Sequence, residues 1–210
     1  ARWFQIFRKY GIIFQEYSNN NIEQIIPQTK NIFCYGKYEN PKYFDDIRPI
    51  ILKEFTPQNP PLESNKHLYS VIESTNSVCI SIRRGDFLSD RFKDRFLVCD
   101  KDYFLKAMDE AKKRISNPTF IFFSDDIEWV RENIHCDVPC YYESGKDPVW
   151  EKLRLMYSCK HFIISNSTFS WWAQYLSRNE NKIVIAPDRW SNNLEEHSML
   201  LDDSFIKIKC

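Results

Sequence analysis

The sequence predicts an α/β fold whose second half is a parallel, Rossmann-type sheet with helices on both faces. Two observations predict it. From residue 77 onward, short apolar runs alternate four times with helical patterns. The runs are apolar throughout rather than at every second position, which is typical of strands buried on both faces.

The first half of the chain is expected to be mostly helical with aromatic-rich connections. Residues 40–55 begin with a capping residue, Asn40, followed by Pro41 at the first helical position, and their apolar side chains recur at close to a 3.6-residue period. Residues 56–61, TPQNPP, hold three prolines and form the clearest break. A second helix is expected from about residue 62 to residue 75.

The elements of the second half follow in order. The predicted strands are VCISI (78–82), TFIFF (119–123), VPCYY (138–142), HFIIS (161–165) and KIVIA (182–186), with SFIKI (204–208) as one further candidate. The predicted helices are one capped by Asp100, IEWVREN (127–133), one opened by Pro148 and TFSWWAQYLS (168–177).

Glycine is scarce, with four residues against 16 Phe, 11 Tyr and 6 Trp. The four stand far apart, at Gly11, Gly36, Gly85 and Gly145. Neither the dinucleotide fingerprint G-x-G-x-x-G nor a Walker-type phosphate loop can therefore be written in this chain. A phosphorylated ligand must be held by side chains and helix ends instead.

The charge is balanced, with 29 basic and 29 acidic residues and a formal net charge of zero. There is no global basic field to gather nucleic acid, so no nucleic-acid partner is expected and any anion site must be local. No run approaches the roughly 18 apolar residues of a membrane span, and no signal peptide opens the chain. We therefore expect no integral membrane segment.

The seven cysteines are odd in number and lack paired spacing. We interpret them as reduced thiols of a reducing compartment and expect a cytoplasmic location, either free or peripheral to the inner face of a membrane. The cluster of His135, Cys136 and Cys140 has no second pair at zinc-finger spacing, so no zinc is predicted.

Three polar clusters follow predicted strands, and ligands of open parallel sheets bind at the carboxyl ends of the strands. The clusters are residues 83–86, residues 124–126 and residues 165–172. All three are expected on one edge of the sheet, which makes this edge the predicted binding site.

Arg83 and Arg84 directly follow a buried strand, where a guanidinium is costly unless it meets an anion. A guanidinium binds phosphate through two parallel hydrogen bonds. The alternative is a surface ion pair, for example with Asp86. Gly85 is expected to supply a tight turn.

Asn166, Ser167 and Thr168 stand at a predicted helix start, where free N–H groups and the helix dipole attract phosphate. Three such residues opposite a double arginine suit a diphosphate, and ordinary capping is the alternative. Trp171 and Trp172 are interpreted as core packing rather than as platforms for a sugar or a base.

The acidic cluster of Ser124, Asp125 and Asp126 has two interpretations. These side chains could accept hydrogen bonds from ribose hydroxyls or guanine N–H groups, or they could cap a helix with an acidic first turn. The stretch from Asp100 to Asp102 resembles an Asp-x-Asp metal clamp but lies at an expected helix start, so capping is predicted and no divalent metal is expected.

The motifs ISIRRGDF (80–87), FIFFSDD (120–126) and FIISNSTFSWWAQYL (162–176) resemble, in this order, those of glycosyltransferase family 11, the alpha-1,2-fucosyltransferases. The resemblance covers most of residues 32–205. It implies a GT-B-like pair of Rossmann-type domains. Residues 1–76 would be a truncated remainder of the N-terminal, acceptor-side domain, and residues 77–210 the C-terminal domain that binds the GDP-sugar.

The resemblance also implies inverting, metal-independent transfer of L-fucose from GDP-fucose to the 2-hydroxyl of a galactose-containing glycan, with no cofactor. It implies Arg83 on the diphosphate, Asp125 or Asp126 near the guanosine, and residues 168–170 against the phosphates. The expected donor-binding residues are Arg83, Arg84, Gly85, Ser124, Asp125, Asp126, Asn166, Ser167, Thr168, Phe169, Ser170 and Trp171.

Two departures from the family pattern stand out. The family shows His two positions before the first arginine, where this chain has Ser81. The family also begins with a glycine-rich segment that this chain does not show, so we expect a missing N-terminal segment. The catalytic groups expected are Arg83 for the leaving diphosphate and Asp86 as the base, with Asp90 behind it and a base from the missing segment as the alternative.

Two further interpretations remain open from the sequence. One is another nucleotide-sugar transferase of GT-B type, and the other is an inactive, truncated fragment that binds carbohydrate through its aromatic surface. The sequence does not predict an oligomeric state.

Overall fold

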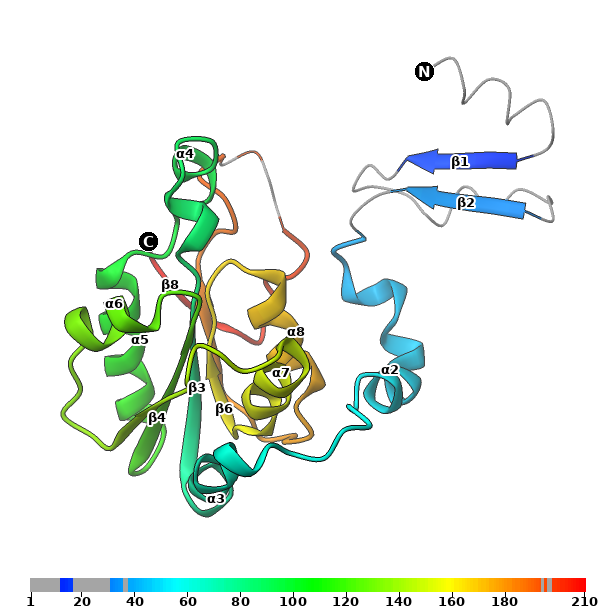
Figure 1. Cartoon of the computed structure of the whole chain (residues 1–210). Coiled ribbons are helices and arrows are strands. Elements are labelled where there is room, and N and C mark those ends of the chain that lie inside the picture. Colours follow the sequence, from blue (N-terminus) through cyan, green and yellow to red (C-terminus); the bar gives the residue numbers. More distant parts are fainter. Residues whose placement is uncertain (1–11, 17–30, 36–37, 194, 196–197) are drawn as a thin grey trace. The chain divides into compact units, whose positions relative to one another are not determined.

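The computed structural model describes residues 12–16, 31–35, 38–193, 195 and 198–210 (Figure 1). Contacts divide the chain into two compact units, residues 1–43 and residues 44–210. The sequence pattern places the boundary later, after residue 76. Residues 44–76 group with the second unit because apolar side chains such as Phe44, Ile51 and Leu68 pack on its core.

The first unit contains two strands, although the sequence predicted a mostly helical structure for this part of the chain. β1 (Ile12–Glu16) and β2 (Asn31–Tyr35) pair in parallel, with Ile12 opposite Asn31. A short 3-10 helix, η1 (Pro41–Tyr43), ends the unit. Gly11 and Gly36 lie outside the described residues.

The second unit is built on one sheet of six parallel strands, as the sequence predicts. Its strands are β3 (Asn76–Ile82), β4 (Pro118–Ser124), β5 (Cys140–Tyr142), β6 (His161–Ile163), β7 (Val184–Pro187) and β8 (Ile206–Ile208). The last of these confirms the additional strand proposed near the end of the sequence.

The strand order is β5-β4-β3-β6-β7-β8, so β3 lies in the middle of the sheet. From β3 the chain moves outward to β4 and β5, then returns through α7 (Val149–Ser158) to β6 on the other side of β3. The order reverses between β3 and β6, where Val78 lies opposite His161. Such a switch point is where ligands bind in open α/β sheets.

Both faces of the sheet are buried. On one face Val78, Ile80 and Ile82 pack with α5 (Lys101–Arg114) and α6 (Ile127–Asn133). On the other face Cys79 packs with α3 (Lys66–Ser74), α7 and α8 (Thr168–Leu176), and Figure 1 shows the two helix layers on either side of the strands. This double cover explains the continuous apolar runs of the sequence.

The helix predicted over residues 40–55 is interrupted. After η1 the chain forms a second 3-10 turn, η2 (Asp45–Ile47), and then α2 (Arg48–Glu54). Asn40 accepts a hydrogen bond from the backbone N–H of Lys42 at 3.1 Å, so it caps the first turn only. The second predicted helix begins as η3 (Glu63–Asn65) and continues as α3. Two short elements after β3, η4 (Gly85–Leu88) and α4 (Lys93–Phe96), were not predicted.

Two buried charged side chains of α7 form hydrogen bonds to the backbone in and just after the proline-rich break at residues 56–61. Arg154 donates to the carbonyl oxygen of Pro57 at 3.1 Å and to that of Asn59. Glu151 accepts from the backbone N–H of Leu62 at 3.0 Å and pairs with Arg154 at 3.4 Å. The break is therefore held in a defined position although it forms no regular structure.

Two cations lie at the carbonyl end of α8. Arg48 donates to the carbonyl oxygens of Tyr175 and Ser177 at 3.0 and 2.9 Å, and Lys182 donates to that of Gln174. Positive charges at this end of a helix interact favourably with its dipole.

The pH dependence of stability tests the burial of Lys182. Burial, together with the nearby charge of Arg48, lowers the pKa of Lys182 from 10.5 to about 8. The unfolded chain then binds more protons than the folded protein between about pH 8 and 10.5, so this group makes stability rise with pH there. We expect the free energy of unfolding of the wild type to rise over this range relative to Lys182→Met, measured by urea unfolding. Parallel pH profiles would contradict this assignment.

The six cysteines whose side chains are described are Cys79, Cys99, Cys136, Cys140, Cys159 and Cys210, and all of them are free thiols. Within the described part of the chain, none of the helices has the length and apolar character needed to cross a membrane.

Candidate functional site

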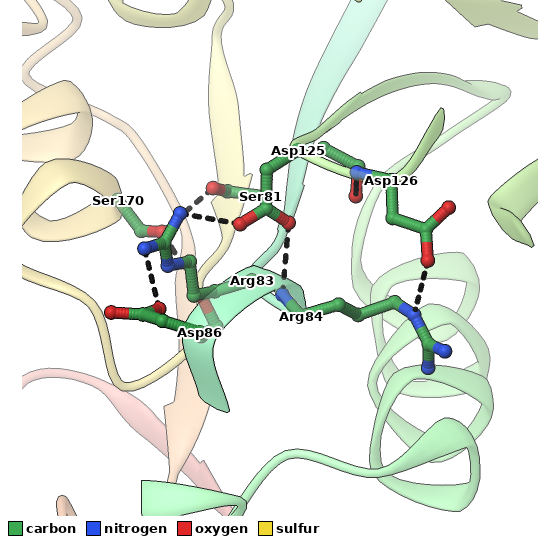
Figure 2. A network of polar contacts seen from close by, with 9 residues as sticks. Ser81, Arg83, Arg84, Asp86, Asp125, Asp126 and Ser170 are labelled. Atoms are coloured by element: carbon green, nitrogen blue, oxygen red, sulfur yellow. Dashed lines mark hydrogen bonds and ion pairs between the residues drawn. The ribbon is translucent and has the colours of Figure 1, made fainter. Parts of the chain in front are cut away.

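The three polar clusters predicted at the strand ends come together at the carboxyl edge of the sheet. They follow β3, β4 and β6, which are neighbours in the order β4-β3-β6. A further link across the switch point joins β3 to α8, because the hydroxyls of Ser81 and Ser170 lie 2.6 Å apart. Figure 2 shows these serines beside the arginines and aspartates that follow β3 and β4.

Arg83 lies at the centre of the charged cluster (Figure 2). One terminal nitrogen of its guanidinium donates to Asp125, and the other donates to Asp86 at 2.6 Å. Its guanidinium also lies 5.7 Å from the ring centre of Phe87. The side chain is 37% exposed, so this cation remains within reach of a ligand.

Asp125 fixes the loop after β3 to the end of β4. While one of its oxygens binds Arg83, the other accepts from the backbone N–H of Arg84 at 2.9 Å. The loop can approach this closely because residue 85 is glycine. A Cβ atom on Gly85 would come within 3.2 Å of the Asp125 carboxyl carbon and still closer to one of its oxygens. A side chain at position 85 would therefore require the Asp125 carboxylate to shift.

Arg84 points away from Arg83, as expected for neighbouring residues of an extended segment. Its Nε donates to Asp126 at 3.1 Å, and its guanidinium lies 3.5 Å from the ring centre of Trp129. The side chain is 19% exposed. Arg84 is therefore more enclosed than Arg83 and has an aromatic partner that the sequence did not suggest.

Asp126 is the cap of α6. Its carboxylate accepts from the backbone N–H of Trp129 at 3.3 Å, and its own N–H donates to the hydroxyl of Ser124 at 3.0 Å. Of the two interpretations of this cluster, the structure confirms capping for Asp126. Asp100 likewise caps α5 by accepting from Tyr103 at 2.8 Å, which confirms the prediction made for it.

Three buried hydroxyls form a chain beneath the charged cluster. Ser170 lies 2.6 Å from Ser81 and 3.1 Å from Ser165, measured between the hydroxyl oxygens. Their residues are 1%, 7% and 0% exposed, respectively. Ser81, the departure from the family pattern, thus serves to hold the first turn of α8 against β3.

The start of α8 leaves its backbone donors without a side-chain cap. Ser167 is the capping residue, but its hydroxyl makes no capping hydrogen bond, in contrast to the ordinary capping considered from the sequence. The first N–H groups of a helix have no partner within the helix. Thr168, the first helical residue, is exposed. These donors are suited to an anion.

Asn166 has a role that the sequence did not reveal. Its side-chain amide donates to the carbonyl oxygens of Phe96 at 2.9 Å and of Trp190 at 3.0 Å, and the residue is 3% exposed. It therefore ties the ends of two loops to the segment that leads into α8.

Replacing Asn166 tests this role. Asn166→Ala removes the amide donor from the buried carbonyl oxygen of Trp190 and one of the two donors to that of Phe96, which still accepts from the N–H of Val98. We therefore expect the free energy of unfolding to fall by about 1–3 kcal/mol. The melting temperature should fall by about 2–12 °C. Asn181→Ala, at an exposed position, is the control and should leave the melting temperature unchanged. Equal melting temperatures for both variants would contradict a holding role for Asn166.

The two tryptophans of α8 pack as predicted, and this burial contrasts with the inclusion of Trp171 among the expected donor-binding residues. Trp171 is 3% exposed, and its indole N–H donates to the carbonyl oxygen of Leu200 at 2.9 Å. Trp172 stacks on Phe44 and Phe55, with ring centres 5.3 and 5.1 Å apart. Phe169 is partly buried against the same core.

The ion-paired groups of the edge carry more negative than positive charge. Arg83 and Arg84 are paired with Asp86, Asp125 and Asp126. No group of three or more His, Cys, Asp or Glu side chains that could hold a metal ion occurs among the described residues.

Comparisons with known proteins show which family the chain matches. The model of the family "Glycosyl transferase family 11" matches residues 7–206. An alpha-1,2-colitosyltransferase of Escherichia coli is 35% identical over 78% of this chain and 57% of its own length. The O-antigen biosynthesis glycosyltransferase WbnK of Escherichia coli is 32% identical over 93% of this chain and 66% of its own length.

A mammalian relative matches a smaller share of the chain. A galactoside 2-alpha-L-fucosyltransferase of Mus musculus is 31% identical over 64% of this chain and 39% of its own length. The chain thus spans 57% and 66% of the lengths of the two Escherichia coli relatives and a smaller share of the mouse relative.

Proposed function

The chain belongs to glycosyltransferase family 11, and from this premise we propose that it is the donor-binding part of an inverting, metal-independent alpha-1,2-fucosyltransferase. The proposed reaction transfers L-fucose from GDP-fucose to the 2-hydroxyl of a galactose-containing glycan. The mouse relative, named a galactoside 2-alpha-L-fucosyltransferase, supports this acceptor and linkage.

One observation carries the proposal. The hydrogen bond between Ser81 and Ser170 brings the uncapped start of α8 next to the strand that leads into Arg83. A guanidinium and a helix N-terminus at one switch point supply hydrogen-bond donors of the kind that bind a diphosphate.

The chemistry follows from the charge that develops during the transfer. When the bond between the anomeric carbon and GDP breaks, negative charge accumulates on the diphosphate. Preorganised donors at that position stabilise the transition state. Arg83 and the N–H groups at the start of α8 would supply these donors, which is why we propose that no metal is needed.

A second candidate function is the transfer of colitose in place of fucose. It is favoured by the 35% identity to the alpha-1,2-colitosyltransferase. The diphosphate site proposed here would serve either donor, because the two sugars differ away from the leaving group.

A panel of ligands in a thermal-shift measurement tests the proposal. A ligand that binds only the folded state raises the melting temperature by mass action. We expect GDP, and GDP-fucose or the corresponding colitose donor, to raise it more than GDP-mannose or UDP-sugars. A shift with UDP-sugars alone would indicate another nucleotide-sugar transferase. A shift with glycans and none with GDP would indicate a carbohydrate-binding fragment.

A further inference from the structure

We propose that Asp86 is an internal competitor for the donor diphosphate. In the free protein it occupies one of the two terminal nitrogens of Arg83, it gives way when a diphosphate binds, and it returns when GDP leaves. The proposal rests on the proposed function, because it concerns the ligand of the same guanidinium.

The two carboxylates on Arg83 are held very differently. Asp125 has a second donor, the backbone N–H of Arg84 at 2.9 Å, and its side chain is 26% exposed. It follows directly on β4, a central strand of the sheet. Asp125 is therefore a fixed partner that orients Arg83.

Asp86 is the exchangeable partner. Its carboxylate has a single contact among the described residues, the 2.6 Å bond to Arg83, and its side chain is 50% exposed. It lies in the short 3-10 turn η4. Its backbone oxygen accepts from both the N–H and the hydroxyl of Ser89, so the turn keeps its shape when the carboxylate moves.

A bound diphosphate would need the terminal nitrogen of Arg83 that Asp86 occupies. Two parallel hydrogen bonds from one guanidinium to a phosphate require both donors of one edge. With Asp125 kept on one terminal nitrogen of Arg83, the edge that a phosphate can use is formed by Nε and the other terminal nitrogen, and Asp86 occupies that nitrogen. Exposed ion pairs contribute little to stability, so Asp86 can leave at small cost. Its negative charge would otherwise repel the incoming phosphate.

This placement argues against Asp86 as the catalytic base. In an inverting displacement the base lies on the face of the sugar opposite the leaving group. Asp86 is bonded to Arg83, the group proposed to hold the leaving diphosphate. It therefore lies on the leaving-group side of the site.

The test compares Asp86→Asn with Asp90→Asn. Both variants remove one negative charge from the same loop, but Asp90 pairs with Lys93 at 2.7 Å rather than with Arg83. GDP affinity and dissociation rate are measured by calorimetry and by stopped-flow competition, with inorganic pyrophosphate as a second probe. Circular dichroism confirms that both variants are folded.

We expect Asp86→Asn to bind GDP and pyrophosphate about 5-fold more tightly, through slower dissociation, and Asp90→Asn to change affinity less than about 2-fold. Unchanged or weaker binding by Asp86→Asn would overturn the proposal. Unchanged GDP affinity with a loss of transfer would instead identify Asp86 as the base. Equal tightening in both variants would show a general charge effect and would also overturn it.

The outcome separates this proposal from the proposed function. If the wild type binds pyrophosphate but not GDP, and Asp86→Asn tightens pyrophosphate binding, the competition holds and the GDP-sugar function fails. If GDP binds to the wild type and Asp86→Asn does not tighten it, the function stands and the competition fails. If neither probe binds, both are overturned.

Discussion

Arg83→Ala is expected to weaken GDP binding by about 10- to 100-fold, because hydrogen bonds to a charged group contribute about 1.5–3 kcal/mol. Under the proposed function, sugar transfer should fall by about 100- to 1,000-fold, as for other donors that stabilise charge in a transition state. The fold should be kept, since the side chain is 37% exposed. Isothermal titration calorimetry with GDP is the direct measurement.

Three matched variants make this result specific. Arg91→Ala removes an exposed cation from the same loop and should leave GDP affinity unchanged. Arg83→Lys keeps the charge but loses the two-bond geometry, so it should fall between the wild type and Arg83→Ala. Arg84→Ala should weaken binding less, because Arg84 is enclosed by Asp126 and Trp129. Unchanged GDP affinity in Arg83→Ala would end the phosphate assignment.

Glu151→Ala is expected to lower the free energy of unfolding more than Arg83→Ala or Asn166→Ala. Glu151 is 0% exposed and accepts hydrogen bonds from Leu62 and Asn65 besides its pair with Arg154. Its removal leaves the buried Arg154 charge uncompensated, which costs about 3–5 kcal/mol. The melting temperature should fall by about 6–20 °C.

A double-mutant comparison separates the ion pair from the lost packing. The double variant Glu151→Ala, Arg154→Met removes the charge as well as its partner, so it should be more stable than Glu151→Ala alone. Glu132→Ala, at an exposed helix position, should leave the melting temperature within about 2 °C of the wild type. A double variant as unstable as the single one would show that packing, rather than the charge, accounts for the loss.

The repeating strands and helices were predictable because their signals are local. The helix predicted over residues 127–133 is α6 to the residue, and the strands at 78–82 and 119–123 lie within β3 and β4. These segments combine a regular apolar pattern with clear breaks at both ends. For them, local preference and tertiary packing favour the same structure.

The prediction was less accurate where packing overrides the local pattern. Residues 40–55 have helical periodicity, yet the helix is interrupted before α2. Phe44 stacks on Trp172 while Arg48 reaches the end of α8, and a continuous helix is not formed between these contacts. The strands β1 and β2 were missed because the aromatic and polar residues around them gave no regular period.

The site was predicted as a set of residues but not as a set of roles. The sequence placed Arg83, Asp125 and Asp126 on one edge, and the structure brings them together. It could not show that Asp126 caps α6, that Asp125 orients Arg83, or that Asn166 ties two loops. A polar residue at a strand end has several partners within reach, and only the backbone path selects among them.

The sequence by itself determined that this chain forms a parallel α/β sheet, that it lacks a glycine cradle for phosphate, and which polar residues follow each strand. These properties depend on residue type and on the spacing of residues that are close together in the sequence. Only the tertiary structure decided that β6 lies beside β3 rather than beside β5. That order depends on α7 crossing the sheet, a contact between distant segments that no local pattern encodes. It places the start of α8 next to the strand that leads into Arg83, where we propose the diphosphate site.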